Sequence, residues 1–233
     1  SKEDKYTFAL NELANYLGVQ EIKKIEGYDV SHISGDNGVA SCVIFSHTGP
    51  IKNDYRLFNI PNDLSGNDIG SLKHVIERRL KYYDDPETKP DLILIDGGKT
   101  QLKFFSEIIS KSKHNDIEVI SIVKGSNRVR ATETIIGKDG ILEIDKFSKA
   151  FLFLQEVRNE SHRFALQAQR KSNRKKIVIS QLDSIDGIGK VLKSRILKKF
   201  KSVRNIKTTS TKELMTIKGI NEKIAIAIKQ KIN

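Results

Sequence analysis

The sequence predicts an α/β fold in which a mixed sheet is flanked by helices and followed by a small all-α domain. Three β-like stretches separated by short turns come first, and strands then alternate with helical segments. The last quarter contains two similar helical segments and carries the whole excess of positive charge. A meander followed by strand–helix units gives a sheet with both antiparallel and parallel pairs, because parallel neighbours are joined by right-handed helical crossovers.

The elements of the α/β part follow from turn residues and hydrophobic periodicity. Turn-forming residues at 35–38 and 48–50 separate the first three strands. The run "DLILID" at 91–96 is continuously apolar, which is typical of a parallel strand buried on both faces. In chain order we expect a helix at 3–18, strands at 24–31, 39–46 and 51–60, a helix at 67–83, a strand at 91–96, a helix at 99–111, a strand at 117–123, a hairpin at 132–144 and a long helix at 148–171.

Charge is distributed unevenly along the chain. Residues 174–233 contain 16 Lys and Arg and four Asp and Glu, so the net charge of +12 lies entirely there. Such a basic module is typical of proteins that face nucleic acid or a membrane; solvated lysine-rich helices in a compositionally biased proteome are the alternative. The segment "RKSNRKK" at 170–176 lacks apolar periodicity and indicates a flexible linker. We therefore expect domains at 1–172 and 180–233, joined by residues 173–179.

Cysteine and apolar content limit the class of protein. The single cysteine, Cys42, lies in an alternating apolar stretch, which indicates a buried thiol in a reducing, cytoplasmic compartment and excludes a disulfide framework. The sequence contains no apolar run near the roughly 20 residues that a membrane span needs, and its start has no signal-peptide core. Ser1 in first place and the single methionine, Met215, indicate a fragment of a longer protein.

Two carboxylates follow apolar strands. Asp29 and Asp96 each come where such a strand stops, and the carboxyl ends of neighbouring strands gather at one edge of a sheet, where ligands bind. Adjacent carboxylates repel each other and lose hydration unless a cation lies between them. Mg²⁺ or Mn²⁺ suits such oxygen ligands, and His162 on the last helix as a third ligand would favour Mn²⁺. The alternative is that the aspartates cap turns or helices and the histidine only packs.

The basic tail contains an internal repeat. Residues 185–197 and 217–228 align with Gly187 opposite Gly219, and each unit consists of a glycine turn followed by an amphipathic helix. This pattern is typical of a helix-hairpin-helix unit, in which glycines let backbone N–H groups bind phosphate without reading the base sequence. A purely structural pairing of the two hairpins is the alternative.

The two hairpins differ at their turns. The first has Gly187, Gly189 and Lys190, and we expect these residues to dominate DNA binding. The second has Asn221 in place of the second glycine, with Lys223 as an assisting cation. Asparagine tolerates left-handed backbone geometry better than most residues, so we expect the turn to persist but a phosphate to approach it less closely than the first turn.

Four motifs in this order resemble one protein family. They are "YDVSHISG" at 28–35, "YRLFNI" at 55–60, "DLILIDGGKTQL" at 91–102 and "RNESHRFA" at 158–165. With the paired hairpins, they make the chain from about residue 10 to its end similar to the C-terminal half of UvrC, a subunit of the bacterial nucleotide excision repair nuclease. The resemblance implies a ribonuclease H-like endonuclease domain with a divalent metal held by Asp29, Asp96 and His162, followed by a tandem helix-hairpin-helix domain.

The resemblance also implies a task in the bacterial cytoplasm. The family acts on damaged double-stranded DNA, and this half makes the incision on the 5′ side of the lesion. The nuclease domain that cuts on the 3′ side and the region that contacts the UvrB subunit belong to an N-terminal part that this chain lacks. A catalytically silent DNA-binding scaffold, which only positions repair partners, is the alternative function.

Further polar residues lie in these motifs. Lys99 opens the helix after the second strand aspartate, while Arg158 and Arg163 flank the histidine; all three are candidates to bind DNA phosphate. His32 is a candidate metal ligand, proton shuttle or hydrogen-bond partner. Glu160 either supports a metal ligand or is one.

The stretch "DGGKT" at 96–100 has a second interpretation. It resembles a phosphate-binding P-loop, but Ile93 stands where that motif needs its first glycine. We therefore expect no nucleotide cofactor. The glycine pair at 97–98 is instead expected to let DNA come close to the strand end.

Overall fold

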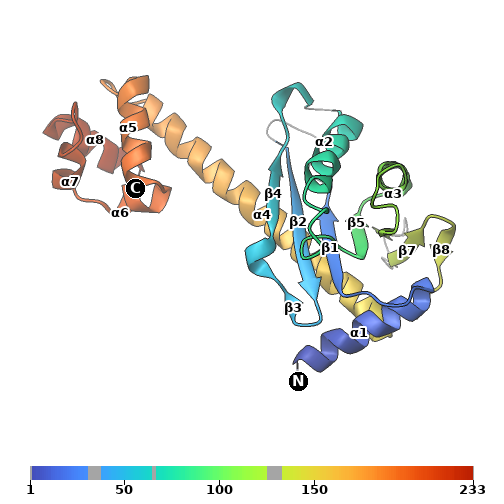
Figure 1. Ribbon diagram of the computed structural model, residues 1–233. Coiled ribbons are helices and arrows are strands. Elements are labelled where there is room, and N and C mark those ends of the chain that lie inside the picture. The colour runs from blue at the N-terminus through green and yellow to red at the C-terminus, as the bar shows by residue number, and fades with distance from the viewer. Residues whose placement is uncertain (1, 31–37, 65–66, 125–132, 233) are drawn as a thin grey trace. The chain divides into compact units, whose positions relative to one another are not determined.

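The structure is a computed structural model that describes residues 2–30, 38–64, 67–124 and 133–232 (Figure 1). The chain divides into two compact units, Ser1–Leu166 and Gln167–Asn233. The first contains the sheet and the second is helical. Within the described residues, no helix combines the length and apolar character that crossing a membrane requires.

The first unit is built on one mixed sheet. Its strands are β1 (Lys24–Asp29), β2 (Val39–Ser46), β3 (Gly49–Pro50), β4 (Arg56–Asn59), β5 (Leu92–Asp96), β6 (Glu118–Lys124), β7 (Glu133–Gly137) and β8 (Gly140–Leu142). They lie in the order β3-β2-β1-β5-β6-β7-β8, with β4 also paired to β2. Only β1, β5 and β6 run parallel to one another among the paired strands described, and the other pairs are antiparallel. The mixed α/β sheet expected from the sequence is therefore confirmed.

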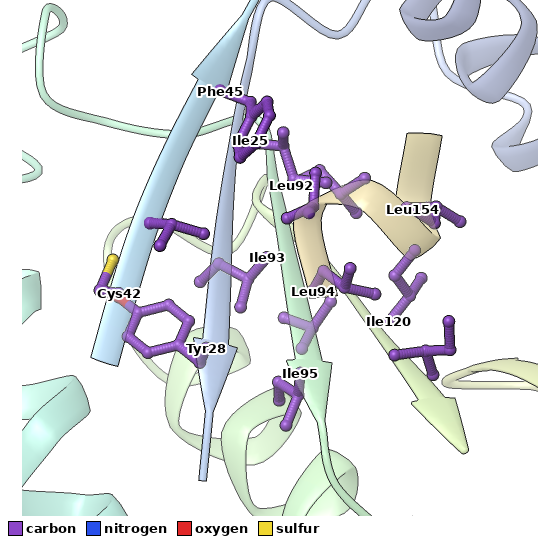
Figure 2. Packing of buried hydrophobic residues seen from close by; sticks show 14 of the residues in the cluster. Ile25, Tyr28, Cys42, Phe45, Leu92, Ile93, Leu94, Ile95, Ile120 and Leu154 are labelled. Carbon is purple, nitrogen blue, oxygen red and sulfur yellow. The ribbon is translucent and has the colours of Figure 1, made fainter. Parts of the chain in front are cut away.

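Helices cover both faces of the sheet. They are α1 (Lys2–Leu17), α2 (Asp68–Leu80), α3 (Lys99–Ser110) and α4 (Lys149–Asp183). Phe45 of β2 packs edge-on against Phe153 of α4, whereas Tyr28 of β1 packs against Phe105 of α3 on the opposite face. The central strands are buried on both sides, which explains their continuously apolar sequences (Figure 2).

Helix α4 approaches β1 closely at Gly27. A Cβ atom built on this glycine would lie 2.5 Å from Cγ1 of Val157, so a larger residue would force Val157 or the helix that carries it to shift. Val157 is fully buried, and the helix face that carries it lies directly over the strand. Gly27 thus fixes the distance between β1 and α4 two residues before the strand reaches Asp29.

The opposite face of β1 carries a buried ion pair. Glu26 is fully buried and accepts hydrogen bonds from Arg79 Nε at 2.8 Å and from the hydroxyls of Tyr28 and Tyr83, both at 2.6 Å. These contacts tie α2 to the central strand. Burial, and next the charge of Glu26, raise the pKa of the Cys42 thiol, which is buried as expected.

Three expectations about local structure differ from what the structure contains. The third strand is not continuous over 51–60, because a short 3₁₀ helix, Lys52–Asp54, separates β3 from β4. His114 follows no site-like spacing in the sequence, which predicts a position on the surface, but the residue is buried edge-on against Tyr83. The segment at 170–176, expected to be a flexible linker, is instead helical, as is the stretch at 173–179 expected to join the domains, because α4 continues to Asp183.

The second unit packs its helices around an apolar core of its own. After the end of α4 come α5 (Lys190–Phe200), α6 (Val203–Thr208), α7 (Thr211–Met215) and α8 (Glu222–Ile232). The buried core includes Ile196 of α5, Ile206 of α6, Leu214 of α7 and Ile228 of α8. The two hairpin turns precede α5 and α8.

Candidate active site

The two strand aspartates are direct neighbours. Asp29 and Asp96 end the parallel strands β1 and β5 and are paired in register. Because residues in register on adjacent strands point to the same face, both carboxylates project toward α4. Asp29 is fully buried, while Asp96 is partly exposed.

Helix α4 brings His162 to this pair. Its Nδ1 atom lies 2.9 Å from Oδ2 of Asp29, and 43 % of its side chain is exposed. One nitrogen or carboxylate oxygen from each of Asp29, Asp96 and His162 lies within 4.8 Å of the others. Three residues that are distant in sequence therefore converge at one end of the sheet.

Electrostatics at the site disfavour two free carboxylates. Burial is the largest cause that raises the pKa of Asp96 above its usual value, and the negative charge of Asp29 is the second. The cations Arg158 and Lys124 act in the opposite direction but do not cancel these effects. Two carboxylate oxygens and one imidazole nitrogen form a donor set that suits Mg²⁺ or Mn²⁺, and a dication would offset the repulsion. The residues present thus fit a divalent metal.

Two buried serines hold the backbone beside the site. Ser41 of β2 is paired in register with Asp29, and its hydroxyl donates to the carbonyl oxygen of Ser161, the residue before His162, at 2.8 Å. Ser121 of β6 donates to the carbonyl oxygen of Ile95, at 3.0 Å, and also bonds that of Gly97. Sequence reasoning missed both serines, because a hydroxyl bonded to a distant backbone carbonyl leaves no local pattern.

Arg158 and Lys99 lie close to the site residues in sequence but differ in how accessible they are. Arg158, one helical turn before the histidine on α4, forms an ion pair with Glu133 of β7, and only 12 % of its side chain is exposed. It also donates to Asn159 through Nε and Nη2. Lys99, the first residue of α3, is exposed. A phosphate would therefore meet Lys99 freely but would have to compete with Glu133 for Arg158.

Glu160 and Arg163 do not lie with the three site residues. The Arg163 guanidinium donates to both carboxylate oxygens of Glu160 at 2.7 Å, and Tyr55 donates to the same carboxylate at 3.0 Å. The bond from Arg163 lowers the pKa of Glu160. Two residues along an α-helix correspond to about 200°, so Glu160 faces away from His162. This geometry does not support a metal-ligand role for Glu160.

Two further expectations concern the loops. His32 lies outside the described residues, so its role stays a prediction. Gly97 was expected to admit DNA, but a Cβ atom there would lie 2.9 Å from Val30 and 3.1 Å from Ile95. Packing within the protein is therefore sufficient reason for this glycine.

The hairpin turns are alike except at one position. Gly187 and Gly219 both have left-handed backbones, with φ of 90° and 103°. Gly189 caps α5 with φ of −84° and offers no side chain to the helix, whereas Asn221, at the matching position, accepts a hydrogen bond from Ile224 N at 2.9 Å. The second position therefore needs no left-handed residue, which corrects the reason expected for tolerance of asparagine.

Comparison with known families assigns both units. Residues 14–166 match the model described as the UvrC RNAse H endonuclease domain, and residues 179–233 match a SAM-like helix-hairpin-helix tandem. Among solved structures, human endonuclease V has a TM-score of 0.44 at 15% identity, covering 65% of this chain and 86% of that protein.

Curated relatives agree with this assignment. UvrABC system protein C of Legionella pneumophila strain Paris is 34% identical over 88% of this chain and 34% of its own length. The proteins of the same name from Pseudomonas putida strain KT2440 and Hahella chejuensis are 35% and 37% identical, over 93% and 89% of this chain and 36% and 34% of their own. The chain thus spans about a third of these relatives, and it belongs to the UvrC RNase H endonuclease domain family, with a helix-hairpin-helix tandem after the nuclease domain.

Proposed function

We propose that the chain is a metal-dependent DNA endonuclease that makes the 5′ incision on the damaged strand in nucleotide excision repair. The observation that carries the proposal is the convergence of Asp29, Asp96 and His162, whose ligand atoms lie within 4.8 Å of one another. The relatives are named as parts of the UvrABC system, which supports damaged double-stranded DNA as the substrate and other Uvr subunits, UvrB among them, as partners.

The two aspartates share one task in this reaction. Asp29, fully buried and fixed at the end of β1, and Asp96, partly open to solvent, would hold the metal between them. A bound dication supplies charge neutralisation at the phosphate and lowers the pKa of water. Asp96 is the carboxylate nearer to solvent and so faces the incoming backbone.

His162 is suited either to complete the ligand set or to move a proton. In the described geometry its Nδ1 atom and Asp29 share one hydrogen bond, so the carboxylate orients the imidazole ring. Hydrolysis forms a bond from water oxygen to phosphorus and breaks the bond from phosphorus to O3′, which then needs a proton to leave as a 3′-hydroxyl. A half-exposed imidazole can deliver that proton.

The helix-hairpin-helix tandem would hold the DNA backbone. Gly187, Gly189 and Lys190 form the first turn, where the N-terminus of α5 carries no side-chain cap and Lys190 is exposed. Gly219, Asn221 and Lys223 form the second, where the asparagine occupies one N–H group. Lys99 at the start of α3 would bind phosphate beside the metal, and Arg158 and Arg163 would do so only by leaving their carboxylate partners.

An incision assay with and without EDTA tests the proposal. The substrate is a duplex that carries one bulky lesion, incubated with the chain, the partner Uvr subunits and Mn²⁺ or Mg²⁺. We expect one cut on the 5′ side of the lesion, a 3′-hydroxyl end, and loss of cutting with EDTA or with Asp29→Ala. Cutting that survives either treatment would refute the metal site, and DNA binding without any cutting would favour a silent scaffold.

A further inference from the structure

One stretch of α4 is strongly basic and is used by none of the sites described above. The basic segment, residues 170–176, contains Arg170, Lys171, Arg174, Lys175 and Lys176, all exposed. No Asp or Glu occurs from residue 161 to residue 182. Within the described part of the chain, none of these five cations forms an ion pair.

The basic segment opposes its own helical conformation. Arg170 and Arg174 are four residues apart, as are Lys171 and Lys175, so each pair places like charges on neighbouring turns of one helix face. Ala168 is the only apolar residue from 167 to 176, so no hydrophobic face stabilises the helix there. A polyanion laid along the segment would remove the repulsion and stabilise the helix.

The charge density matches that of duplex DNA. A helix rises about 1.5 Å per residue, so the segment extends over about 9 Å and carries roughly one positive charge per 1.8 Å. Duplex DNA carries about one negative charge per 1.7 Å of its axis. A membrane surface fits less well, because an interfacial helix needs an apolar face to insert and the segment has none.

We infer that the basic segment is a further DNA-backbone contact, independent of base sequence, whose helix is stabilised by DNA binding. The inference rests on the proposed function only in requiring that the chain acts on DNA. It assigns to DNA a part of the chain that lies before the first hairpin turn and outside the helix-hairpin-helix match, which begins at residue 179.

The test compares the full chain with two charge-matched variants. One changes all five cations of the basic segment to Gln, which keeps helix propensity. The control changes five exposed lysines of the first unit to Gln: Lys5, Lys23, Lys73, Lys81 and Lys146. Binding to an undamaged duplex is measured from about 50 to 200 mM salt. We expect the log–log salt slope to become shallower by about 3 to 4 in the segment variant and by less than about 1 in the control.

Hydrogen exchange of the backbone provides a second measurement. Amides of residues 168–178 should exchange at least tenfold more slowly when the wild-type chain is saturated with duplex. In the segment variant they should already exchange more slowly without DNA, and DNA should change them little. Equal salt slopes for both variants, or unchanged exchange in wild type, would overturn the inference.

Two other results separate this inference from the proposed function. Wild-type chain that binds undamaged duplex with the expected slope, but does not cut the lesion-bearing duplex when the partner Uvr subunits and Mn²⁺ are present, refutes the endonuclease while leaving the DNA contact intact. Binding to vesicles of anionic lipid that depends on the five cations, with no such dependence for duplex, would assign the segment to a membrane surface and overturn the inference.

Discussion

At the scale of single residues, Asp96 combines a proposed role as a metal ligand with a cost to stability. Its carboxylate lies next to Asp29, and burial together with that neighbour raises its pKa. A raised pKa means that the folded protein binds the proton more tightly than the unfolded chain does. Without metal, the contribution of Asp96 to stability is therefore fully present below the unfolded pKa of 3.8 and is lost as the pH rises through the folded value.

Asp96→Asn should therefore separate activity from stability. We expect incision to fall by at least about 10³-fold, because the metal loses a ligand. At pH 7 and without metal, the variant should unfold at a temperature equal to or a few degrees above that of wild type, a gain of about 1 kcal/mol or less because the carboxyl is partly exposed. Thermal scans from pH 3 to 8 measure this difference.

The control for this prediction is the response to metal. Mn²⁺ should raise the unfolding temperature of wild type but not that of Asp96→Asn, since ligand binding stabilises only the state that binds. If the variant were destabilised at every pH, burial of the charged carboxylate and its repulsion by Asp29 would not be what raise the pKa of Asp96.

The sequence predicted which residues come together at the site, but not which side chains their neighbours would contact. The ordered motifs predicted that Asp29, Asp96 and His162 belong to one site, because each lies within a distinctive stretch of sequence; the structure brings the three together, and their roles stay a prediction. The pairing of Glu160 with Tyr55 and Arg163 was missed, because it depends on a partner from a distant loop and on which helix face the carboxylate occupies. Side-chain contacts between distant elements leave no signal in one sequence.

At the scale of elements, the site depends on how α4 is seated on the sheet. Gly27 sets the approach at Val157, and one helical turn later Ser41 bonds the Ser161 carbonyl. Ser41 is paired in register with Asp29, two residues after Gly27 on β1, so these two residues of the strand match the helical turn from Val157 to Ser161. The next residue of the helix is His162. The distance between Asp29 and His162 follows from these two contacts.

Removing the hydroxyl of Ser41 should loosen this arrangement without unfolding the protein. In Ser41→Ala the Ser161 carbonyl stays within its helix, so we expect a loss of only about 0.5–1.5 kcal/mol in stability. Incision and Mn²⁺ affinity should fall about 10- to 100-fold, as for other groups that hold metal ligands in place. Titration calorimetry with Mn²⁺ measures the affinity without relying on activity.

Ser71→Ala is the matched control for Ser41→Ala. Ser71 is also fully buried and its hydroxyl donates to a backbone carbonyl, that of Leu64 at 3.3 Å, but it belongs to α2 on the opposite face of the sheet. It should lose similar stability and keep its Mn²⁺ affinity. Equal losses of affinity in both variants would show that Ser41 acts only through general stability.

The two hairpins permit a reciprocal exchange of residues. Asn221 occupies the N–H of Ile224, while the equivalent position Gly189 leaves the first turn of α5 without a side-chain cap. Gly189→Asn should cap α5, stabilise the domain slightly and weaken duplex binding about 3- to 10-fold, the value of one hydrogen bond to phosphate. Asn221→Gly should do the reverse and tighten binding about 2- to 5-fold.

Neither exchange alters the net charge of the protein, so the salt dependence of binding serves as the control for both variants. The salt slope of binding should stay the same in both variants, since it counts neutralised phosphates and not hydrogen bonds. Equal affinity in wild type and both variants would mean that these helix N-termini do not touch the DNA backbone.

Elements were predicted well where hydrophobic periodicity is strong. The buried strands β5 and β6 and the helix α3 begin and end within about two residues of their expected bounds. The predicted end of the long helix was wrong, because residues 170–176 have no apolar pattern and were interpreted as a flexible linker. The sequence from Lys149 to Asp183 contains neither Gly nor Pro, so nothing in it stops a helix.

At the scale of the whole molecule, charge and chemistry lie in different parts of the chain. Residues 1–173 have no net charge and contain all three site residues, while residues 174–233 carry the entire excess of +12. Each unit has its own buried core. This division was predictable, because charge counts and internal repeats are properties of the sequence alone.

Cutting the chain after Lys171 should therefore separate DNA affinity from the metal site. The fragment 1–171 contains the first unit whole, since that unit ends at Leu166, and we expect it to unfold cooperatively and to bind Mn²⁺ as the full chain does. It has no net charge and lacks both hairpins, so its affinity for duplex at physiological salt should fall at least about 100-fold, with a shallower salt slope. The complementary fragment 167–233 should bind duplex with a steep salt slope and cut nothing. Tight binding by fragment 1–171 would contradict the assignment of the positive charge to DNA, whereas failure of that fragment to bind Mn²⁺ despite cooperative unfolding would place the fault in the metal site.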